Sequence, residues 1–234
     1  MELSKRLRAV AELVTSGRRV ADIGTDHAYV PIWLVLNGRI PSAIAMDVNE
    51  GPLQRAREHI REYGLEEKIG TRRSDGLKEL NVQEADSMIA AGMGGALIMQ
   101  ILSDCPETVA SLKECVLQPQ SEIGKVRRFL IENGFSIECE DMVYEDGKYY
   151  PMMRAVPGKK EHVPYTEEEY EYGRFLLKEK NPVLNAFLKR EIRIRKNILE
   201  SLKKSQEPSE SSRIRIVEIE KEIEQLHAAE NRYR

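Results

Sequence analysis

The sequence predicts an α/β domain with a mostly parallel sheet, closed by an antiparallel strand pair and followed by a helical hairpin. Short β-branched runs alternate with helical repeats over the first two thirds of the chain, which is the pattern of a parallel sheet covered by helices. The stretch "EDGK" then separates two strand-like runs, as in a β-hairpin. After Gly158 the chain becomes charged and helical.

Seven segments have the pattern of strands: residues 18–24, 42–49, 69–77, 85–95, 114–120 and the two runs within 135–158. The helices expected between them follow from apolar residues spaced three or four apart. The first contains Leu3, Leu7 and Val10 and is expected to close at Gly17. The others are residues 29–38, 50–64, 96–104 and 121–134.

Two regions are expected, a catalytic domain over residues 1–158 and a helical coiled-coil domain over residues 159–234. A polar linker, "KKEHVPYTEEEY", precedes one long helix that is expected to run to about Ser205. The stretch "SQEPSES" breaks it, and a second helix carries apolar residues at heptad spacing, namely Ile216, Ile219, Ile223 and Leu226. A short turn between two helices predicts an antiparallel hairpin.

Composition narrows the class of protein. The chain has 234 residues and a formal net charge of −3, with −5 up to Gly158 and +2 after it. Its 3 cysteines have neither disulfide-framework nor metal-ligand spacing. No apolar run approaches the length of a membrane span. We therefore expect a cytoplasmic protein, with no membrane partner and no metal, as a monomer or weak dimer.

Four turns after strands hold the candidate site, because ligands of doubly wound sheets bind at the carboxyl ends of the strands. Gly24 lets the backbone approach a ligand, Asp47 can accept hydrogen bonds from ribose hydroxyls, and Asp75 can meet an adenine edge. The predicted cofactor-binding residues are Asp22, Gly24, Thr25, Asp26, His27, Asp47, Val48, Asn49, Ser74, Asp75, Gly76, Gly92, Met93 and Gly94.

The first turn, "DIGTDHAY", favours a cofactor without phosphates. A dinucleotide fingerprint needs G-x-G-x-x-G so that phosphates can reach a helix N-terminus, but Asp26 and Tyr29 stand in this turn. A carboxylate would repel a pyrophosphate and would suit a sulfonium or an amino group. S-adenosylmethionine combines a ribose, an adenine, a positive sulfur and an α-amino group, and is the predicted cofactor.

Simpler interpretations remain open at this stage. Asp75 could be a helix N-cap, and the Gly94-Gly95 pair only a tight turn. Tyr29 and Trp33 could both be core aromatics, which is the better interpretation for Trp33. His27 could merely orient a neighbour. For the whole chain, a dinucleotide oxidoreductase and a non-catalytic adaptor that docks a protein through its hairpin are the two alternatives.

The combination "VADIGTDHAYVP", "AMDVNEGPL", "SDGL", "AGMGG" and "LQPQ", followed by a charged helical hairpin, resembles the bacterial TrmK family of tRNA adenine-N1 methyltransferases. The resemblance covers nearly the whole chain. It implies a class I, Rossmann-like methyltransferase fold, with S-adenosylmethionine as methyl donor and adenine 22 in the tRNA D-arm as target. It also implies that the helical hairpin helps to hold the tRNA.

The catalytic candidates are Asp26, Tyr29 and His27. N1 of an unpaired adenine carries a lone pair, so it needs positioning and no prior deprotonation, while methylation makes the ring cationic. A carboxylate beside the ring or its amine can stabilise that charge, which points to Asp26. Tyr29 offers a stacking or hydrogen-bonding surface, and N1 must be unpaired to react.

A basic stretch, residues 188–204, lies on the first long helix expected after Gly158. It contains seven lysines and arginines and two glutamates. Beside an acidic domain that must hold a polyanion, this charge predicts phosphate contact. The predicted RNA-binding residues are Lys189, Arg190, Arg193, Arg195, Lys196, Lys203 and Lys204.

Overall fold

The computed structural model describes residues 1–159, 163–204 and 209–233. Backbone contacts divide the chain into two units, Met1–Pro164 and Tyr165–Arg234. In the part that the structure describes, no helix is both long enough and apolar enough to cross a membrane.

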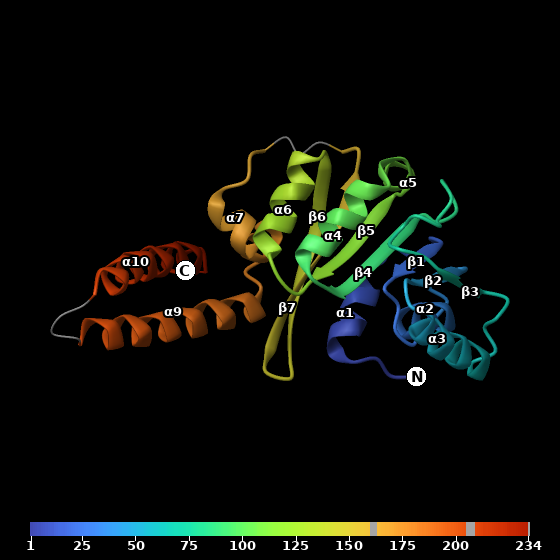
Figure 1. Cartoon of the computed structure of the whole chain (residues 1–234), viewed down its shortest axis with the longest axis horizontal. Coiled ribbons are helices and arrows are strands. Elements are labelled where there is room, and N and C mark those ends of the chain that lie inside the picture. Colours follow the sequence, from blue (N-terminus) through green and yellow to red (C-terminus); the bar gives the residue numbers. More distant parts are fainter. Residues whose placement is uncertain (160–162, 205–208, 234) are drawn as a thin grey trace. The chain divides into compact units, whose positions relative to one another are not determined.

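The first unit is built on a seven-stranded sheet in the order β3-β2-β1-β4-β5-β7-β6 (Figure 1). Strands β1 to β5 are parallel, and β7 lies antiparallel between β5 and β6. The predicted mostly parallel sheet with a terminal antiparallel hairpin is confirmed. The strands are β1 (Val20–Ile23), β2 (Ala43–Asp47), β3 (Ile69–Arg73), β4 (Ser87–Met93), β5 (Glu114–Pro119), β6 (Phe135–Glu145) and β7 (Lys148–Pro157).

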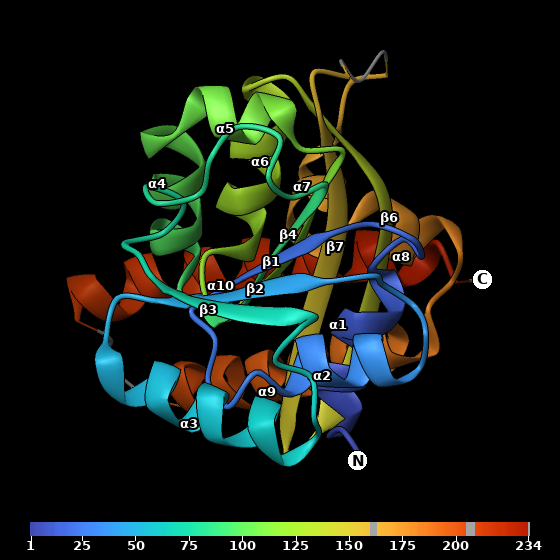
Figure 2. The same cartoon turned by 90° about the vertical axis from the view of Figure 1, so that its right-hand side faces the viewer.

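Helices cover both faces of this sheet, with α1, α2 and α3 on one side and α4, α5 and α6 on the other (Figure 2). All six residues of β5 are buried, as expected for a strand covered on both faces. The helices are α1 (Lys5–Leu13), α2 (Tyr29–Leu36), α3 (Glu50–Glu62), α4 (Gly95–Asp104), α5 (Pro106–Ser111) and α6 (Ile123–Glu132).

Local sequence signals explain most element ends. Gly38 and Gly64 follow α2 and α3 with φ of +64° each, the left-handed conformation that ends helices. Asp146 and Gly147 have φ of +48° and +79° between β6 and β7, as a two-residue hairpin turn requires. Trp33 packs against the core, so its interpretation as a core aromatic is confirmed.

Two predictions for the first unit are corrected. Helix α1 ends at Leu13, with Val14 in extended conformation as its C-cap, so Gly17 does not close it. The Gly17 amide instead donates to the Arg39 carbonyl oxygen. Helix α5 was missed because its six residues, "PETVAS", are too short to show a period.

The second unit contains α7 (Glu167–Tyr172), α8 (Arg174–Lys178), α9 (Pro182–Lys203) and α10 (Glu210–Asn231). One long helix was predicted before the break, but Gly173 separates α7 from α8, and Asn181 caps α9 through its side chain. Helices α9 and α10 form the predicted antiparallel pair, since Arg195 bonds Glu222 and Lys203 bonds Glu220. The predicted break, "SQEPSES", covers residues 205–211, of which 205–208 lie outside the described residues. The rest of the stretch was wrongly assigned to the break, because Ser209 is the N-cap of α10 and Glu210 and Ser211 form its first turn.

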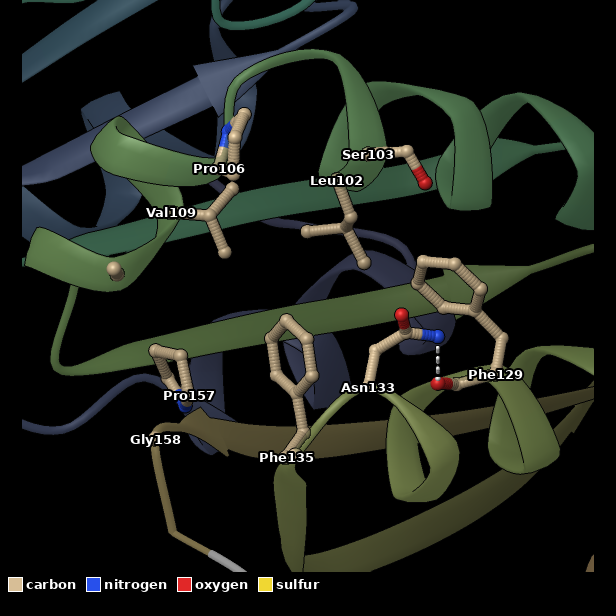
Figure 3. Close-up of a pocket in the computed structure, with 11 residues that line it drawn as sticks. Leu102, Ser103, Pro106, Val109, Phe129, Asn133, Phe135, Pro157 and Gly158 are labelled. Carbon is tan, nitrogen blue, oxygen red and sulfur yellow. Dashed lines mark hydrogen bonds between the residues drawn. The ribbon is translucent and has the colours of Figure 1, made fainter.

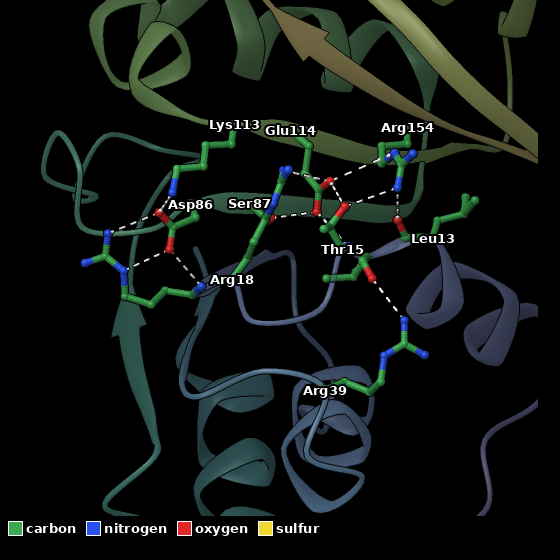
Figure 4. A network of polar contacts seen from close by, with 11 residues as sticks. Leu13, Thr15, Arg18, Arg39, Asp86, Ser87, Lys113, Glu114 and Arg154 are labelled. Carbon is green, nitrogen blue, oxygen red and sulfur yellow. Dashed lines mark hydrogen bonds and ion pairs between the residues drawn. The ribbon is translucent and has the colours of Figure 1, made fainter.

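A buried carboxylate joins the amino ends of β4 and β5 (Figure 4). The Glu114 side chain is 1% exposed and accepts hydrogen bonds from the Ser87 hydroxyl at 2.7 Å and from the Thr15 amide and hydroxyl at 2.9 and 2.7 Å. Arg18 lies 2.8 Å from the same carboxylate, and Arg154 lies 3.9 Å from it. This network ties the loop after α1 to the sheet.

Replacing Glu114 with glutamine should lower the free energy of unfolding by about 3 kcal/mol, because a buried ion pair that loses one partner leaves the other charge uncompensated. Urea denaturation measures this change. Glu66→Gln, at an exposed position of the same unit, is the matched control and should change stability by less than about 0.5 kcal/mol. Equal effects of the two substitutions would contradict the role of the network.

Candidate active site

The sheet changes winding direction at β1, whose neighbours are β2 and β4. Ligands of such sheets bind at the carboxyl ends of the strands beside this point. A cavity of about 250 Å³ opens there. It is lined by Arg6, Leu7, Asp22, Gly24, Thr25, Asp26, His27, Tyr29, Val30 and Ala91.

The turn after β1 has an unusual backbone. Gly24, His27 and Ala28 have φ of +68°, +65° and +55°, and left-handed backbone is costly for residues with a Cβ. At Gly24 a Cβ would lie 2.1 Å from the Met93 Cε atom. The structure therefore brings two predicted cofactor-binding residues into contact, one from the turn after β1 and one from the end of β4.

Asp26 is held by an arginine that the sequence analysis missed. Arg55 of α3 donates to Asp26 Oδ1 from Nε at 3.0 Å and from Nη2 at 2.9 Å. The His27 Nε2 atom lies 3.4 Å from the same oxygen. The interactions converge on one carboxylate oxygen, which fixes the orientation of the half-exposed Asp26 side chain.

Three rings stack beside this carboxylate. The His27 and Tyr29 rings are 4.9 Å apart and nearly parallel, and His59 of α3 lies 4.9 Å from His27 and 5.2 Å from Tyr29. The His59 Nδ1 atom lies 3.2 Å from the His27 carbonyl oxygen. Tyr29 is 36% exposed, so it presents a ring at the cavity and is not a core aromatic. His59 was also missed, because an isolated histidine on a helix gives no signal.

The turn after β2 is ordered by its own carboxylate. Asp47 Oδ1 accepts a hydrogen bond from the Asn49 amide at 2.7 Å, and the Asp47 carbonyl oxygen accepts one from the Ser74 amide at 2.9 Å. Val48 is half exposed, and its carbonyl oxygen accepts from Arg73. The predicted second and third turns are thus neighbours.

The turn after β3 is compact. The buried Ser74 hydroxyl donates to the Gly76 carbonyl oxygen at 2.8 Å, and Gly76 lies against Ile101 with φ of +61°. Asp75 pairs with Lys78 at 2.5 Å. No helix begins here in the described chain, so the interpretation of Asp75 as a helix N-cap is wrong.

The turn after β4 is anchored from β5. The Gly92 amide donates to Gln118 Oε1 at 3.0 Å, and Gly94 is the N-cap of α4. A Cβ on Gly95 would lie 2.4 Å from the Ser121 carbonyl oxygen, so the glycine pair also serves tight packing. Gln118 is fully buried. It lies in the "LQPQ" motif, but the sequence analysis gave it no role.

Burial perturbs the carboxyl group at the end of β1. Asp22 is 8% exposed, and desolvation raises its pKa to about 6, with a further contribution from the negative charge of Asp47. The His27 Nδ1 atom is buried without a hydrogen-bond partner. A buried carboxyl and an unsatisfied ring nitrogen in one cavity fit a polar ligand with a cationic group, which agrees with the amino-acid part of S-adenosylmethionine.

A larger cavity, of about 470 Å³, lies between α4, α5, α6 and the ends of β6 and β7 (Figure 3). Its lining is mostly apolar, including Leu102, Val109, Phe129 and Phe135, with no titratable side chain. It is away from the carboxyl ends of the parallel strands, so we place the site in the smaller cavity. Among the described residues, no cluster of three potential metal ligands occurs.

The predicted RNA-binding residues lie on α9, where they differ in their contacts. Arg195 bonds Glu191 and Glu222, and Lys203 bonds Glu220, so glutamates neutralise these two cations. Lys189, Arg193 and Lys196 are exposed at spacings of four and three residues, which places them on one helix face. Arg190 and Lys204 are exposed as well.

A doubly wound sheet in this strand order, with acidic and aromatic side chains where a dinucleotide turn needs glycines, defines a class I methyltransferase. Residues 20–228 match the model of the TrmK family, described as tRNA (adenine(22)-N(1))-methyltransferase. The chain belongs to this family, and the resemblance inferred from its motifs is confirmed.

Relatives match over most of their lengths. The Bacillus subtilis tRNA (adenine(22)-N(1))-methyltransferase is 37% identical over 194 residues, which cover 81% of this chain and 80% of that protein. A Streptococcus pneumoniae structure in complex with S-adenosyl-L-methionine has a TM-score of 0.85 and 32% identity, covering 98% of this chain and 100% of that one. The M. capricolum TrmK structure with S-adenosyl-homocysteine has a TM-score of 0.84 and 29% identity, covering 100% of both chains.

Replacing Asp22 with asparagine should stabilise the ligand-free protein at neutral pH. An aspartate with a folded-state pKa near 6 and an unfolded value near 3.9 binds more protons when folded, so its contribution to stability falls as pH rises between these values. Two pKa units correspond to about 2–3 kcal/mol. Urea denaturation of both proteins at pH 4 and pH 7.5 measures the difference.

The asparagine variant should gain stability over the wild type at pH 7.5 and lose most of that gain at pH 4. A constant difference at both pH values would show that Asp22 does not titrate in this range. Asp75→Asn, at an exposed carboxylate of the same sheet edge, controls for a general change of charge.

Proposed function

We propose that the cavity at the ends of β1 and β4 is where this chain transfers a methyl group to N1 of adenine 22 of tRNA. Family membership confirms the predicted activity, and the oxidoreductase and adaptor alternatives are therefore set aside. The observation that carries the location is the turn after β1, whose Asp26, His27 and Tyr29 line the cavity. Transfer of radiolabelled methyl to unmodified tRNA, with mapping of the labelled atom, tests the activity.

S-adenosylmethionine supplies an electrophilic methyl group when it is bound, and structures of relatives hold it or its product. In this proposal Asp47 accepts hydrogen bonds from the ribose hydroxyls, while Ser74, Asp75 and Gly76 meet the adenine. The other predicted cofactor-binding residues are Asp22, Gly24, Thr25, Asp26, His27, Val48, Asn49, Gly92, Met93 and Gly94. Gly24 has φ of +68°, which disfavours a side chain, and a Cβ there would also meet the end of the Met93 side chain.

Asp26, Tyr29 and His27 position the target base. Arg55 engages Oδ1 of Asp26, so the other carboxylate oxygen is available to accept a hydrogen bond from the adenine amine. Because Arg55 offsets part of the negative charge, Asp26 acts mainly as an oriented acceptor. Tyr29 provides the ring on which the unpaired base stacks. His27 contacts the Asp26 carboxylate and stacks on the Tyr29 ring, and so helps to orient both side chains. Orientation of this kind can supply several kcal/mol of the rate acceleration.

The helical unit holds the tRNA through phosphate contacts in this proposal. Support comes from the exposed basic face of α9, formed by Lys189, Arg193 and Lys196. Residues 1–158, in contrast, carry a net negative charge. Arg195 and Lys203 bond glutamates of the same unit, which makes them weaker candidates for contact. None of the three cysteines forms a disulfide in the described parts of the chain, which supports work in the reducing cytoplasm. We propose further that the protein works as a monomer or weak dimer.

Replacing Asp26 with asparagine should lower kcat for tRNA methylation by about 10²-fold. Asparagine has only one acceptor oxygen, and if Arg55 engages it, the amide group and not an acceptor faces the adenine amine. Arg55→Ala should lower kcat less, by about 10-fold, because the carboxylate remains but is free to rotate. Initial rates of methyl transfer at saturating tRNA give kcat, and calorimetric titration with S-adenosylhomocysteine gives the cofactor affinity.

The folded state should be stable in both variants, since the Asp26–Arg55 pair is half exposed and such pairs contribute about 0–1 kcal/mol. Cofactor affinity within about threefold of wild type supports the target-base role of Asp26. Loss of cofactor binding with unchanged kcat at saturation would instead assign Asp26 to the methionine part of the cofactor.

Reversing charge at Arg193 and Lys196 to glutamate should raise KM for tRNA at least tenfold, because two phosphate contacts become repulsive. The salt dependence of tRNA binding should become shallower. Arg213→Glu with Lys221→Glu, two exposed positions on α10, changes net charge equally and is the matched control. A similar rise in KM for both double variants would mean that net charge, and not the α9 face, holds the tRNA.

A further inference from the structure

Arg6 of α1 contributes a cation to the cavity that the predicted site residues do not include. Its side chain lines the cavity together with Asp22, Gly24 and Asp26. A Cβ built on Gly92 would lie 3.4 Å from the Arg6 Nη1 atom. The guanidinium therefore lies beside both the β1 and the β4 turns.

The position of this guanidinium is fixed from several sides. Nη1 donates to Gln118 Oε1 at 3.0 Å, and the Arg6 Cζ atom lies 5.5 Å from the centroid of the Tyr150 ring. The backbone is fixed as well, since the amides of Lys5 and Arg6 donate to the Glu145 carboxylate at 2.6 and 3.3 Å. A preorganised arginine of this kind loses little entropy when it binds a ligand.

Part of the guanidinium remains available. Within the described residues, its Nε and Nη2 atoms have no hydrogen-bond partner, and no carboxylate forms an ion pair with Arg6. Asp22 lines the same cavity and likewise has no ion-pair partner in the described parts of the chain. The cavity thus presents a cation and a buried carboxyl group that are not paired with each other.

Unpaired opposite charges in one small cavity are complementary to a zwitterion. A phosphate group of the nucleic acid would fit less well, because Asp22 and Asp26 line the same space and would repel it. The ligand of this site in the proposed function carries such a zwitterion, since the methionine part of S-adenosylmethionine has an α-ammonium and an α-carboxylate.

We infer that Arg6 binds the α-carboxylate of the methionine part of the cofactor through its free guanidinium nitrogens, while Asp22 faces the α-ammonium. This inference rests on the proposed function. Arginine matches a carboxylate with two parallel N–H donors, so the contact selects for the complete amino-acid tail. Arg6 is accordingly a cofactor-binding residue contributed by α1, outside the four turns that follow the strands.

Calorimetric titration tests this with two ligands, S-adenosylhomocysteine and its decarboxylated analogue, which keeps the amine but lacks the carboxylate. Arg6→Gln should bind S-adenosylhomocysteine about 10- to 100-fold more weakly than wild type, the range expected for hydrogen bonds to a charged group. The same variant should bind the decarboxylated analogue as wild type does, within about twofold. Arg8→Gln, on the same helix and paired with Glu12, should leave both affinities unchanged.

Each other outcome overturns the inference in a recognisable way. Equal weakening of both ligands by Arg6→Gln would mean that Arg6 only supports the fold of the site. Unchanged affinity for both ligands, with a raised KM for tRNA, would assign Arg6 to a phosphate of the substrate. If wild-type protein bound neither ligand, the proposed function itself would fail. Arg6→Lys should recover part of the affinity for S-adenosylhomocysteine, since it keeps the charge but not the paired donors.

Discussion

The turn after β1 is the constraint on which the site depends. Three of its residues hold left-handed backbone, and two of them, His27 and Ala28, carry side chains that make this conformation costly. Helix α3 supports this conformation from outside: Arg55 bonds the Asp26 carboxylate, and His59 contacts the His27 carbonyl oxygen and ring. These two positions on α3 are four residues apart, and so lie on one face of that helix.

Helix α3 also begins directly after the turn that carries Asp47. One rigid element therefore connects the carboxylate proposed for the ribose with the residues proposed for the target base. Asp22, in the neighbouring strand β1, is kept in a desolvated position that raises its pKa to about 6. Buried, unpaired polar groups reduce the stability of the empty protein, and a ligand that satisfies them recovers that stability on binding.

Most of the fold could be predicted because its signals are local. All seven strands, the hairpin at Asp146-Gly147 and the paired tail helices follow from periodicity and turn residues. The site was predicted in part, since motifs identify strand ends but not what packs on them. Arg55 bonds Asp26, which is 29 positions away in the sequence, and Gln118 bonds Arg6, which is 112 positions away. Sequence periodicity carries no information about such distant pairs. The split before α9 was missed because Gly173, within a strongly helical sequence, was given no weight.

In both units, whether a charged side chain can act on a ligand depends on the oppositely charged residue that it already contacts. Counted along the sequence, α9 carries a uniform excess of cations, yet Glu191, Glu220 and Glu222 neutralise Arg195 and Lys203. What remains for an outside polyanion is the face with Lys189, Arg193 and Lys196. In the first unit the signs are exchanged: the functional side chain is an anion, Asp26, and the cation of Arg55 compensates part of its charge. A cationic methylated adenine then experiences an oriented acceptor and not a strong field, which favours release of the product.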